Sequence, residues 1–273
     1  MNIKDYQLYD MHMHTRFSGD SEADPFAMAQ QAIDIGLAGI CFTDHLDMDY
    51  MRTPGLFDLD IPSYKKEIAL VKEQFKNKLD ISWGIELGLQ PYLAEKNNSI
   101  ALENAFDFVI GSTHQIQQQD IYYPDFYEGK SEDDCYRIYF EETLQNAQSN
   151  VDFDVYGHLD YVVRYGPNKN KYYTYEKFDD VIDEIFRTLI SRGKGIELNM
   201  AGFKYGLGQA HPNLEGLKRY KELGGEIITL GSDGHTPEQI AWEFEKAPAI
   251  LKEAGFTYFT IFHNRKPEFK KIV

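Results

Sequence analysis

The chain has 273 residues, of which 42% are hydrophobic. This is enough to bury the core of one α/β barrel domain or of two smaller domains. We prefer one domain that spans residues 1–273. Asp and Glu (44) outnumber Lys and Arg (28), and the formal net charge of −16 disfavours nucleic acid and anionic membranes as partners, so a phosphate-bearing ligand would need a strongly cationic local site. The residues after Met1 do not show the charged and then apolar pattern of a signal peptide, and no apolar run is long enough to span a bilayer. The two cysteines suggest no disulfide framework, so we expect a cytoplasmic protein.

Short apolar runs alternate with helical patterns along the chain, which is typical of βαβ units. The apolar runs predict strands at residues 9–15, 37–43, 81–86, 106–114, 153–158, 195–199 and 226–231, and a last run follows at 256–262. Helical spacing predicts helices at residues 25–36, 62–75, 132–148, 178–192, 214–223 and 237–254, and a helical or irregular piece at 92–105. Loops are expected at residues 48–60, 115–130, 164–175 and 200–212.

The chemistry-bearing side chains lie at one end of the predicted strands. They are His12 and His14, His45, Glu86, His114, His158, and Asp233 with His235. Each one alone has an ordinary explanation, such as a hydrogen-bonded core histidine or a solvated strand end. In a parallel β/α barrel, however, the carboxyl ends of the strands converge on one face, which is where such folds carry their sites. We therefore interpret the set as one site on the rim of a barrel.

Imidazoles and carboxylates without thiolates are typical of a catalytic zinc, iron or manganese site, and not of a closed structural zinc site. The set is too large for one ion, so two or three metals are expected to share the rim. A carboxylate such as Glu86 can bridge two ions, because each of its oxygens can bind one. Two neighbouring metals can hold a hydroxide at neutral pH and clamp the oxygens of an in-line displacement. The sequence therefore predicts a metal-dependent hydrolase.

Six motifs that follow one another along the chain indicate a protein family more specifically together than any one of them does alone. They are His12-Met13-His14, Thr43-Asp44-His45, the strand-end Glu86, Ser112-Thr113-His114, Gly157-His158-Leu159-Asp160 and Ser232-Asp233-Gly234-His235. Over nearly the whole chain this order resembles the polymerase and histidinol phosphatase (PHP) family. The resemblance implies a single-domain, distorted (β/α)7 barrel, similar to a TIM barrel, with a trinuclear metal site. Residues 157–164 and the chain length resemble the histidinol-phosphate phosphatase branch, which acts in histidine biosynthesis.

The resemblance also implies which residues hold three divalent metal ions, either zinc, iron or manganese. The first ion would take His12, His14, Glu86 and Asp233, the second would share Glu86 and take His114 and His158, and the third would take Asp20, His45 and His235. Asp20 departs from the family pattern, because several relatives have a histidine there. A carboxylate lowers the charge of the site and can change its metal preference. The alternative for Asp20 is a loop residue that caps a turn.

Other polar residues are candidates for catalysis or substrate binding. Asp44 and Asp160 could orient imidazoles or shuttle protons, or could cap the backbone at strand ends. Arg164 could grip a phosphate oxygen, and its ordinary alternative is a surface ion pair. Weaker candidates for substrate contacts are Gln115, Asn199, Lys204, His211 and Arg265. We expect Glu86, Asp160 and Arg164 to act in catalysis.

The predicted function is hydrolysis of a small phosphomonoester, L-histidinol phosphate, by a hydroxide that bridges the first two metals. The alternative is a PHP phosphoesterase of other specificity, such as a protein-tyrosine phosphatase or a nucleotide phosphatase, whose specificity would lie in the loops at 48–60 and 115–130. The charge of −16 disfavours a nuclease. A non-enzymatic module with a decayed metal site is disfavoured by the nearly complete ligand set. The sequence has no heptad run or self-pairing edge from which to predict an oligomeric state.

Overall fold

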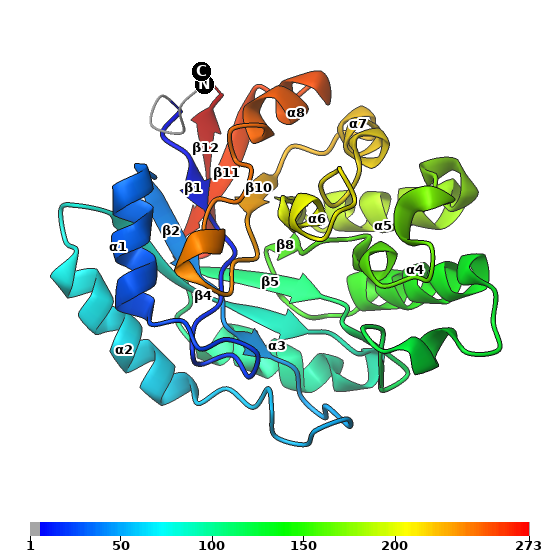
Figure 1. The fold of residues 1–273 in the computed structure, drawn as a ribbon, viewed down its shortest axis with the longest axis horizontal. Helices are drawn as coiled ribbons and strands as arrows, with labels where there is room; N and C mark the ends of the chain where they lie inside the picture. Colours follow the sequence, from blue (N-terminus) through cyan, green and yellow to red (C-terminus); the bar gives the residue numbers. More distant parts are fainter. Residues whose placement is uncertain (1–5, 273) are drawn as a thin grey trace.

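The computed structural model describes residues 6–272, and its centre is a parallel sheet curled into a barrel (Figure 1). The strands follow one another in the order β1 (Tyr9–Asp10), β2 (Gly39–Phe42), β4 (Asp80–Gly88), β5 (Phe108–Ser112), β8 (Val155–Tyr156), β9 (Gly195–Asn199) and β10 (Ile228–Gly231), and the short β3 (His45–Leu46) also pairs with β4. All of these pairings are parallel. The two ends of the sheet meet where the Met11 N–H donates to the Leu230 carbonyl at 2.8 Å. The predicted α/β barrel is confirmed.

Helices cover the outside of the barrel (Figure 1). They are α1 (Pro25–Ile35), α2 (Ile61–Gln74), α3 (Ala94–Glu103), α4 (Glu132–Gln148), α5 (Asp179–Ser191), α7 (Leu214–Glu222) and α8 (Ala247–Glu253). The short α6 (Ala201–Lys204) follows β9 and lies at the carboxyl ends of the strands, where Lys204 donates to the Asp233 carbonyl. The 3₁₀ turns are Pro91–Leu93, Pro124–Tyr127, Tyr161–Arg164, Lys169–Lys171, Tyr175–Lys177 and Pro237–Gln239. Local signals set their ends: α1 begins where the Asp24 carboxylate accepts from the Phe26 N–H, and it ends at Gly36, whose φ is 86°. The predicted helices corresponding to α1, α2, α4, α5 and α7 are confirmed.

The predicted helix at residues 237–254 is wrong, because only its last part, α8, is α-helical. Upstream of α8, Ala241 has a φ of 52°, which is incompatible with a right-handed helix. The Ala241 N–H instead donates to Oδ2 of the buried Asp10 at 2.9 Å. A tertiary hydrogen bond to the first strand thus replaces the helical one.

The last apolar run forms a strand outside the barrel. There, β11 (Tyr258–His263) pairs antiparallel with β12 (Lys266–Lys271), a strand that the sequence pattern did not predict. Nearly all of β12 is exposed, and it carries lysines and a proline without apolar alternation. At the hairpin turn the Arg265 N–H donates to the carbonyl of Asp107, just before β5 begins, at 2.8 Å. The hairpin turn therefore lies at the amino ends of the barrel strands.

Two of the predicted loops meet at the opposite end, beyond the carboxyl ends of the strands. The loop at 115–130 contains a small hairpin of β6 (Gln115–Ile116) and β7 (Gln119–Asp120). The Tyr50 hydroxyl of the first loop donates to Asp120 of the second at 2.7 Å. Within residues 6–272, none of the helices has the length and apolar character needed to cross a lipid bilayer.

Candidate metal centre

Glu86, near the end of β4, lies at the centre of the polar cluster, and its side chain is fully buried. Its Oε2 lies 3.2 Å from Nε2 of His12 and 3.0 Å from Nδ1 of His45. Its Oε1 lies 2.9 Å from Nε2 of His158 and 3.3 Å from Nε2 of His114. Nε2 of His14 lies 3.6 Å from Oε2 as well. The two oxygens of this carboxylate thus face different sets of imidazoles, as a bridging ligand requires.

A second group of rings lies against the first. His14 stacks on His45 and on His235, with ring centroids 4.1 Å and 4.3 Å apart. Its Nε2 is 3.4 Å from Oδ1 of Asp233. Asp20 approaches from its loop, with Oδ2 3.1 Å from Nε2 of His235 and 3.8 Å from Nε2 of His45. The barrel therefore brings every predicted metal ligand, including Asp20, into one cluster.

The polar atoms of this cluster fit metal ions. Four groups of three side chains each offer ligand atoms within 4.8 Å of one another: His12, His14 and Glu86; Glu86, His114 and His158; His14, His45 and His235; and His45, Asp47 and His114. Several of these atoms are buried and have no hydrogen-bond partner among the described residues: His12 Nε2, His14 Nε2, His45 Nδ1 and Glu86 Oε2. Buried polar atoms without partners cost free energy, and divalent cations would satisfy all of them at once.

The pKa values of the ligand histidines fall into two groups. Burial alone would lower the pKa values of His12, His45 and His114, but facing carboxylates raise them. Burial lowers the pKa of His158 to about 4, and burial together with neighbouring imidazoles lowers the pKa of His14 well below its ordinary value. Burial alone would raise the pKa values of Glu86 and Asp233, but facing imidazoles and the Arg164 guanidinium lower them well below the usual range. Neutral imidazoles and ionised carboxylates are the forms that bind metal, so an ion bound here would displace protons from His12, His45 and His114.

Two carboxylates that the sequence did not single out orient the ligand imidazoles. Glu197 of β9 places Oε1 2.7 Å from Nδ1 of His12, and its Oε2 accepts from the backbone N–H of His158 at 2.9 Å. Asp47 places Oδ1 2.7 Å from Nδ1 of His114. In each case the other ring nitrogen turns toward Glu86. Both carboxylates lie two positions from a residue that had been singled out, so the period of two along a strand was the available signal.

Replacing Glu197 with Gln is expected to weaken zinc binding by about 10- to 100-fold, because the amide keeps the shape but loses the charge that fixes the His12 ring. Competition with a chromophoric chelator measures this affinity in the folded protein. An unchanged zinc affinity would show that the His12 ring does not depend on Glu197.

Asp44 holds a loop and does not contact a ligand imidazole in any hydrogen bond of the structure. Its Oδ1 accepts from the Thr15 N–H at 2.6 Å and from the Ser18 hydroxyl at 2.8 Å. The Ser18 oxygen in turn lies 3.2 Å from Nδ1 of His14. Backbone capping, the second of the two alternatives, therefore describes Asp44, and its effect on His14 is indirect.

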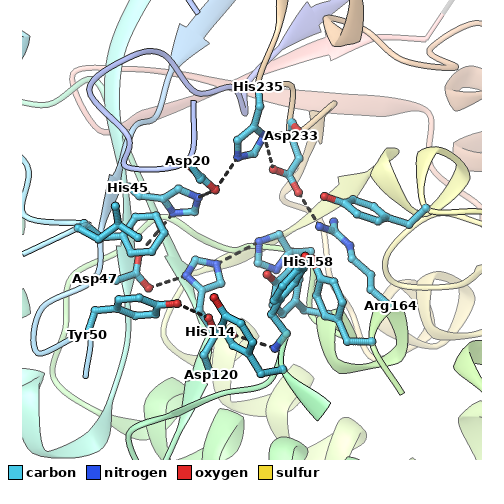
Figure 2. Close-up of a pocket in the computed structure, with 17 residues that line it drawn as sticks. Asp20, His45, Asp47, Tyr50, His114, Asp120, His158, Arg164, Asp233 and His235 are labelled. Carbon is cyan, nitrogen blue, oxygen red and sulfur yellow. Dashed lines mark hydrogen bonds and ion pairs between the residues drawn. The ribbon is translucent and has the colours of Figure 1, made fainter. Parts of the chain in front are cut away.

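A cavity of about 300 Å³ opens beside the cluster (Figure 2). One side is formed by predicted ligands: Asp20, His45, His114, His158, Asp233 and His235. The other side is largely aromatic, with Tyr50, Phe57, Tyr122, Tyr123, Tyr161, Tyr165 and Tyr205, and it contains one carboxylate, Asp120. The alternative of another phosphoesterase specificity places that specificity in the loops at 48–60 and 115–130, but the sequence does not single out these side chains. The cavity can therefore hold a small molecule with one end at the ligand cluster.

Arg164 and Lys204 are the predicted substrate residues that the structure places at or beside this cavity. Arg164 is 3% exposed and lines the cavity wall, where it donates from Nη1 to Oδ2 of Asp233 at 2.9 Å. Lys204 lies in an adjoining hollow with Asp20, and its Nζ donates to the backbone carbonyl of Asp233 at 2.8 Å and to Gln239 at 3.1 Å. Arg164 therefore forms a buried ion pair with Asp233, and the alternative of a surface ion pair is wrong.

The other predicted substrate residues do not line the cavity. Gln115 is 2% exposed, and Asn199 and His211 are fully buried. Asn199 and His211 lie behind Arg164, which donates to both of them. Arg265 lies at the amino ends of the strands, where its Nε donates to Asp154 at 2.6 Å. The prediction of direct substrate contact is therefore wrong for these four residues. Three of them are buried in the fold, and Arg265 lies at the opposite face of the barrel.

The prediction that Asp160 acts directly in catalysis is also wrong. It is fully buried and absent from the cavity wall, and its Oδ1 lies 2.5 Å from Nδ1 of His211. A carboxylate in this place acts on His211 and not on a molecule in the cavity.

Comparisons with known proteins agree with this geometry. The chain matches the model of the PHP domain over residues 10–201. It is 35% identical over 260 residues to a histidinol-phosphatase of Lactococcus lactis, which covers 94% of this chain and 95% of that protein. It is also 32% identical over 244 residues to a probable histidinol-phosphatase of Clostridium acetobutylicum, with 88% and 91% covered.

A solved structure gives the same result. The crystal structure of histidinol phosphate phosphatase from Lactococcus lactis, in complex with zinc, L-histidinol and phosphate, matches with a TM-score of 0.88 and 34% identity. The match covers 96% of this chain and 99% of that chain. The similarity therefore extends over the whole barrel.

Proposed function

The chain belongs to the PHP domain family, and from this premise we propose that it hydrolyses L-histidinol phosphate to L-histidinol and inorganic phosphate, a step of histidine biosynthesis. One observation of the structure carries the proposal: imidazole and carboxylate atoms from distant strand ends converge on Glu86 beside a cavity of small-molecule size. The zinc, L-histidinol and phosphate bound by the Lactococcus relative support the assignment of substrate and product.

The proposed cofactor is a set of three divalent ions. Their ligands would be His12, His14, Glu86 and Asp233 for the first, Glu86, His114 and His158 for the second, and Asp20, His45 and His235 for the third. Bound there, the ions would act as Lewis acids on phosphoryl oxygens and lower the pKa of a water molecule to supply a nucleophile. Zinc is favoured by the Lactococcus complex, and iron or manganese would suit the same nitrogen and oxygen donors.

The residues around the ions have two further roles, which are to orient the ligand imidazoles and to stabilise negative charge. Glu197 and Asp47 fix ring orientations, so that the imidazole nitrogens aimed at the ions do not rotate away. Arg164 is a fixed cation on the cavity wall. Each of its terminal nitrogens donates one hydrogen bond to the protein and keeps a second N–H. These N–H groups would stabilise the negative charge that grows on the phosphoryl oxygens during displacement.

The aromatic side of the cavity suits the rest of the substrate. L-Histidinol phosphate carries an amine and an imidazole, and Asp120 is the carboxylate that faces the cavity from this side. Asp120 is held in place because it accepts from the Tyr50 hydroxyl at 2.7 Å and from the Tyr122 N–H at 2.8 Å. We propose that it binds a cationic nitrogen of the substrate, with tyrosine rings packing around it.

Replacing Asp120 with Asn is expected to raise KM for L-histidinol phosphate by about 10-fold or more, since a hydrogen bond to a charged group contributes roughly 1.5–3 kcal/mol. The KM for p-nitrophenyl phosphate, which has no cationic nitrogen, should change little. Steady-state kinetics on both esters measures the difference.

The matched control is Asp125→Asn on the same loop, because Asp125 pairs with Arg52 at the surface and does not line the cavity. If Asp120→Asn changed both esters equally, or neither, Asp120 would not recognise the cationic part of the substrate.

A PHP phosphoesterase of other specificity is the second candidate. A panel of L-histidinol phosphate, phosphotyrosine and a nucleoside monophosphate separates the two, with metal content measured on the same sample. We expect kcat/KM to be highest by far for L-histidinol phosphate. Faster release of phosphate from phosphotyrosine or from the nucleotide would overturn the proposed substrate.

The proposed partner is this small substrate, with no role for nucleic acid or membrane, in keeping with the net charge of −16. We propose that the enzyme works in the cytoplasm, where the thiols of Cys41 and Cys135, both buried and free, stay reduced.

A further inference from the structure

Three buried side chains form a hydrogen-bonded row behind the cavity wall. The Nε–H of Arg164 donates to Nε2 of His211 at 3.1 Å, and Nδ1 of His211 lies 2.5 Å from Oδ1 of Asp160. His211 and Asp160 are fully buried, and Arg164 is 3% exposed. Only Arg164 reaches the cavity. Any effect of the other two residues on a bound molecule must therefore pass through Arg164.

The hydrogen bonds in this row define the tautomer of His211. A guanidinium can only donate, so Nε2 of His211 must be the unprotonated nitrogen that accepts from Arg164. The ring proton is therefore on Nδ1, where it is donated to the Asp160 carboxylate. A carboxylate that fixes one ring nitrogen thus sets the other nitrogen as the acceptor for the guanidinium.

We propose that His211 is a positioning residue, which holds the Arg164 guanidinium in the orientation that binds phosphoryl oxygen. This rests on the proposed function, since it takes Arg164 as the residue that meets the phosphate group. Asp160 supports the same role one step further back.

The other contacts of Arg164 show what this support accomplishes. Its Nη1 donates to Asp233 at 2.9 Å and its Nη2 to Asn199 at 3.1 Å, while its guanidinium carbon lies 4.9 Å and 4.7 Å from the ring centroids of Tyr161 and Tyr205. The bond to His211 fixes the Nε end of the guanidinium, while the bonds to Asp233 and Asn199 fix its two terminal nitrogens, so the plane is held at three points. The N–H groups that remain free on Nη1 and Nη2 would be those available to an anion in the cavity, whose wall Arg164 lines beside Asp233 (Figure 2).

His211 is itself tied to the barrel. Its backbone N–H donates to the Asn199 carbonyl at 2.8 Å, and the Asn199 N–H donates to the His211 carbonyl, also at 2.8 Å. Asn199 is the last residue of β9, so the ring is anchored to a barrel strand although it belongs to a loop. A rigid support of this kind is what precise placement of a charged group requires.

Two substitutions of similar polarity separate positioning from packing. In His211→Asn the amide can still donate to Asp160 but is too short to accept from Arg164, whereas in His211→Gln the longer side chain can present its oxygen to Nε. Inorganic phosphate, titrated calorimetrically into the zinc-loaded protein, is the probe. We expect Asn to weaken phosphate binding by about 10-fold, as loss of a hydrogen bond to a charged group implies, and Gln to stay within about 3-fold of the parent. Equal losses for Asn and Gln, or none for either, would overturn the proposal.

The same pair in an Arg164→Lys background shows whether His211 acts through Arg164. Lysine has no Nε–H to be held, so His211→Asn should then change phosphate binding by less than about 2-fold. A loss as large as in the parent protein would mean that His211 merely maintains the fold.

A measurement on the unaltered protein keeps the proposal testable if the variants fail to fold. Nitrogen-15 chemical shifts of the His211 ring should show a protonated Nδ1 and an unprotonated Nε2, and the reverse tautomer would overturn the proposed row. Neither phosphate binding nor the tautomer depends on turnover of L-histidinol phosphate, so failure of the proposed function would be seen separately, as an inactive enzyme that still binds phosphate.

Discussion

Replacing Glu86 with Gln is expected to remove bound metal and phosphatase activity together, lowering kcat/KM at least about 10³-fold while the barrel remains folded. Glutamine has the same shape, but it is neutral and offers one oxygen in place of two. In the structure both oxygens of Glu86 face imidazoles, at distances between 2.9 Å and 3.3 Å. No other predicted ligand is shared between groups in this way on both of its oxygens. Elemental analysis and a phosphate-release assay on one preparation measure both effects.

Glu142→Gln is the matched control, because Glu142 is a largely buried glutamate of α4 that belongs to none of the ligand groups. It should keep the metal content and rate of the parent. Near-normal turnover by Glu86→Gln with two or more metals still bound would contradict the bridging role of Glu86.

Replacing Arg164 with Lys is expected to lower kcat/KM by about 10²-fold, mostly through kcat, with the metal content unchanged. Lysine keeps one positive charge near Asp233, but it loses the planar fork and the hydrogen bonds to His211 and Asn199. Its ammonium cannot stabilise a developing charge from a fixed position. Steady-state kinetics on L-histidinol phosphate, with circular dichroism to confirm folding, measures the effect.

Arg137→Lys serves as the control, since Arg137 pairs with Asp180 at the protein surface, and its kinetics should match the parent. If Arg164→Lys retained near-normal kcat, or if its defect followed a loss of metal, Arg164 would not be the residue that stabilises the phosphoryl group.

Much of the barrel and its ligand cluster could be predicted from the sequence, because both depend on local periodicity. Alternating apolar runs fixed the strands, and a polar residue directly after each run had to reach the common rim of a parallel barrel. That single geometric rule brought together His12, Glu86 and His158, which are far apart in the sequence. Asp20 was expected at the cluster only from the family resemblance, because a loop residue has no periodicity to constrain it, and the structure places it beside His235.

The remaining features depend on tertiary contacts that leave no local pattern. The helix predicted before α8 is interrupted because Ala241 hydrogen-bonds to Asp10 from the other end of the chain. Arg265 was a candidate for substrate contact by its residue type, but a hairpin turn places it at the amino ends of the strands. In the sequence Glu197 cannot be distinguished from an ordinary strand residue. Only the closed barrel shows that its carboxylate faces the His12 ring.

Phosphate release from L-histidinol phosphate, by protein stripped of metal with a chelator and then reloaded with zinc, tests most directly whether the rim is a metal-dependent phosphatase. The stripped protein should lose activity by at least about 10³-fold, and zinc should restore the rate once two or more ions per chain are bound. Equal rates before and after reloading, or no phosphate release from this ester by the fully loaded protein, would contradict the assignment.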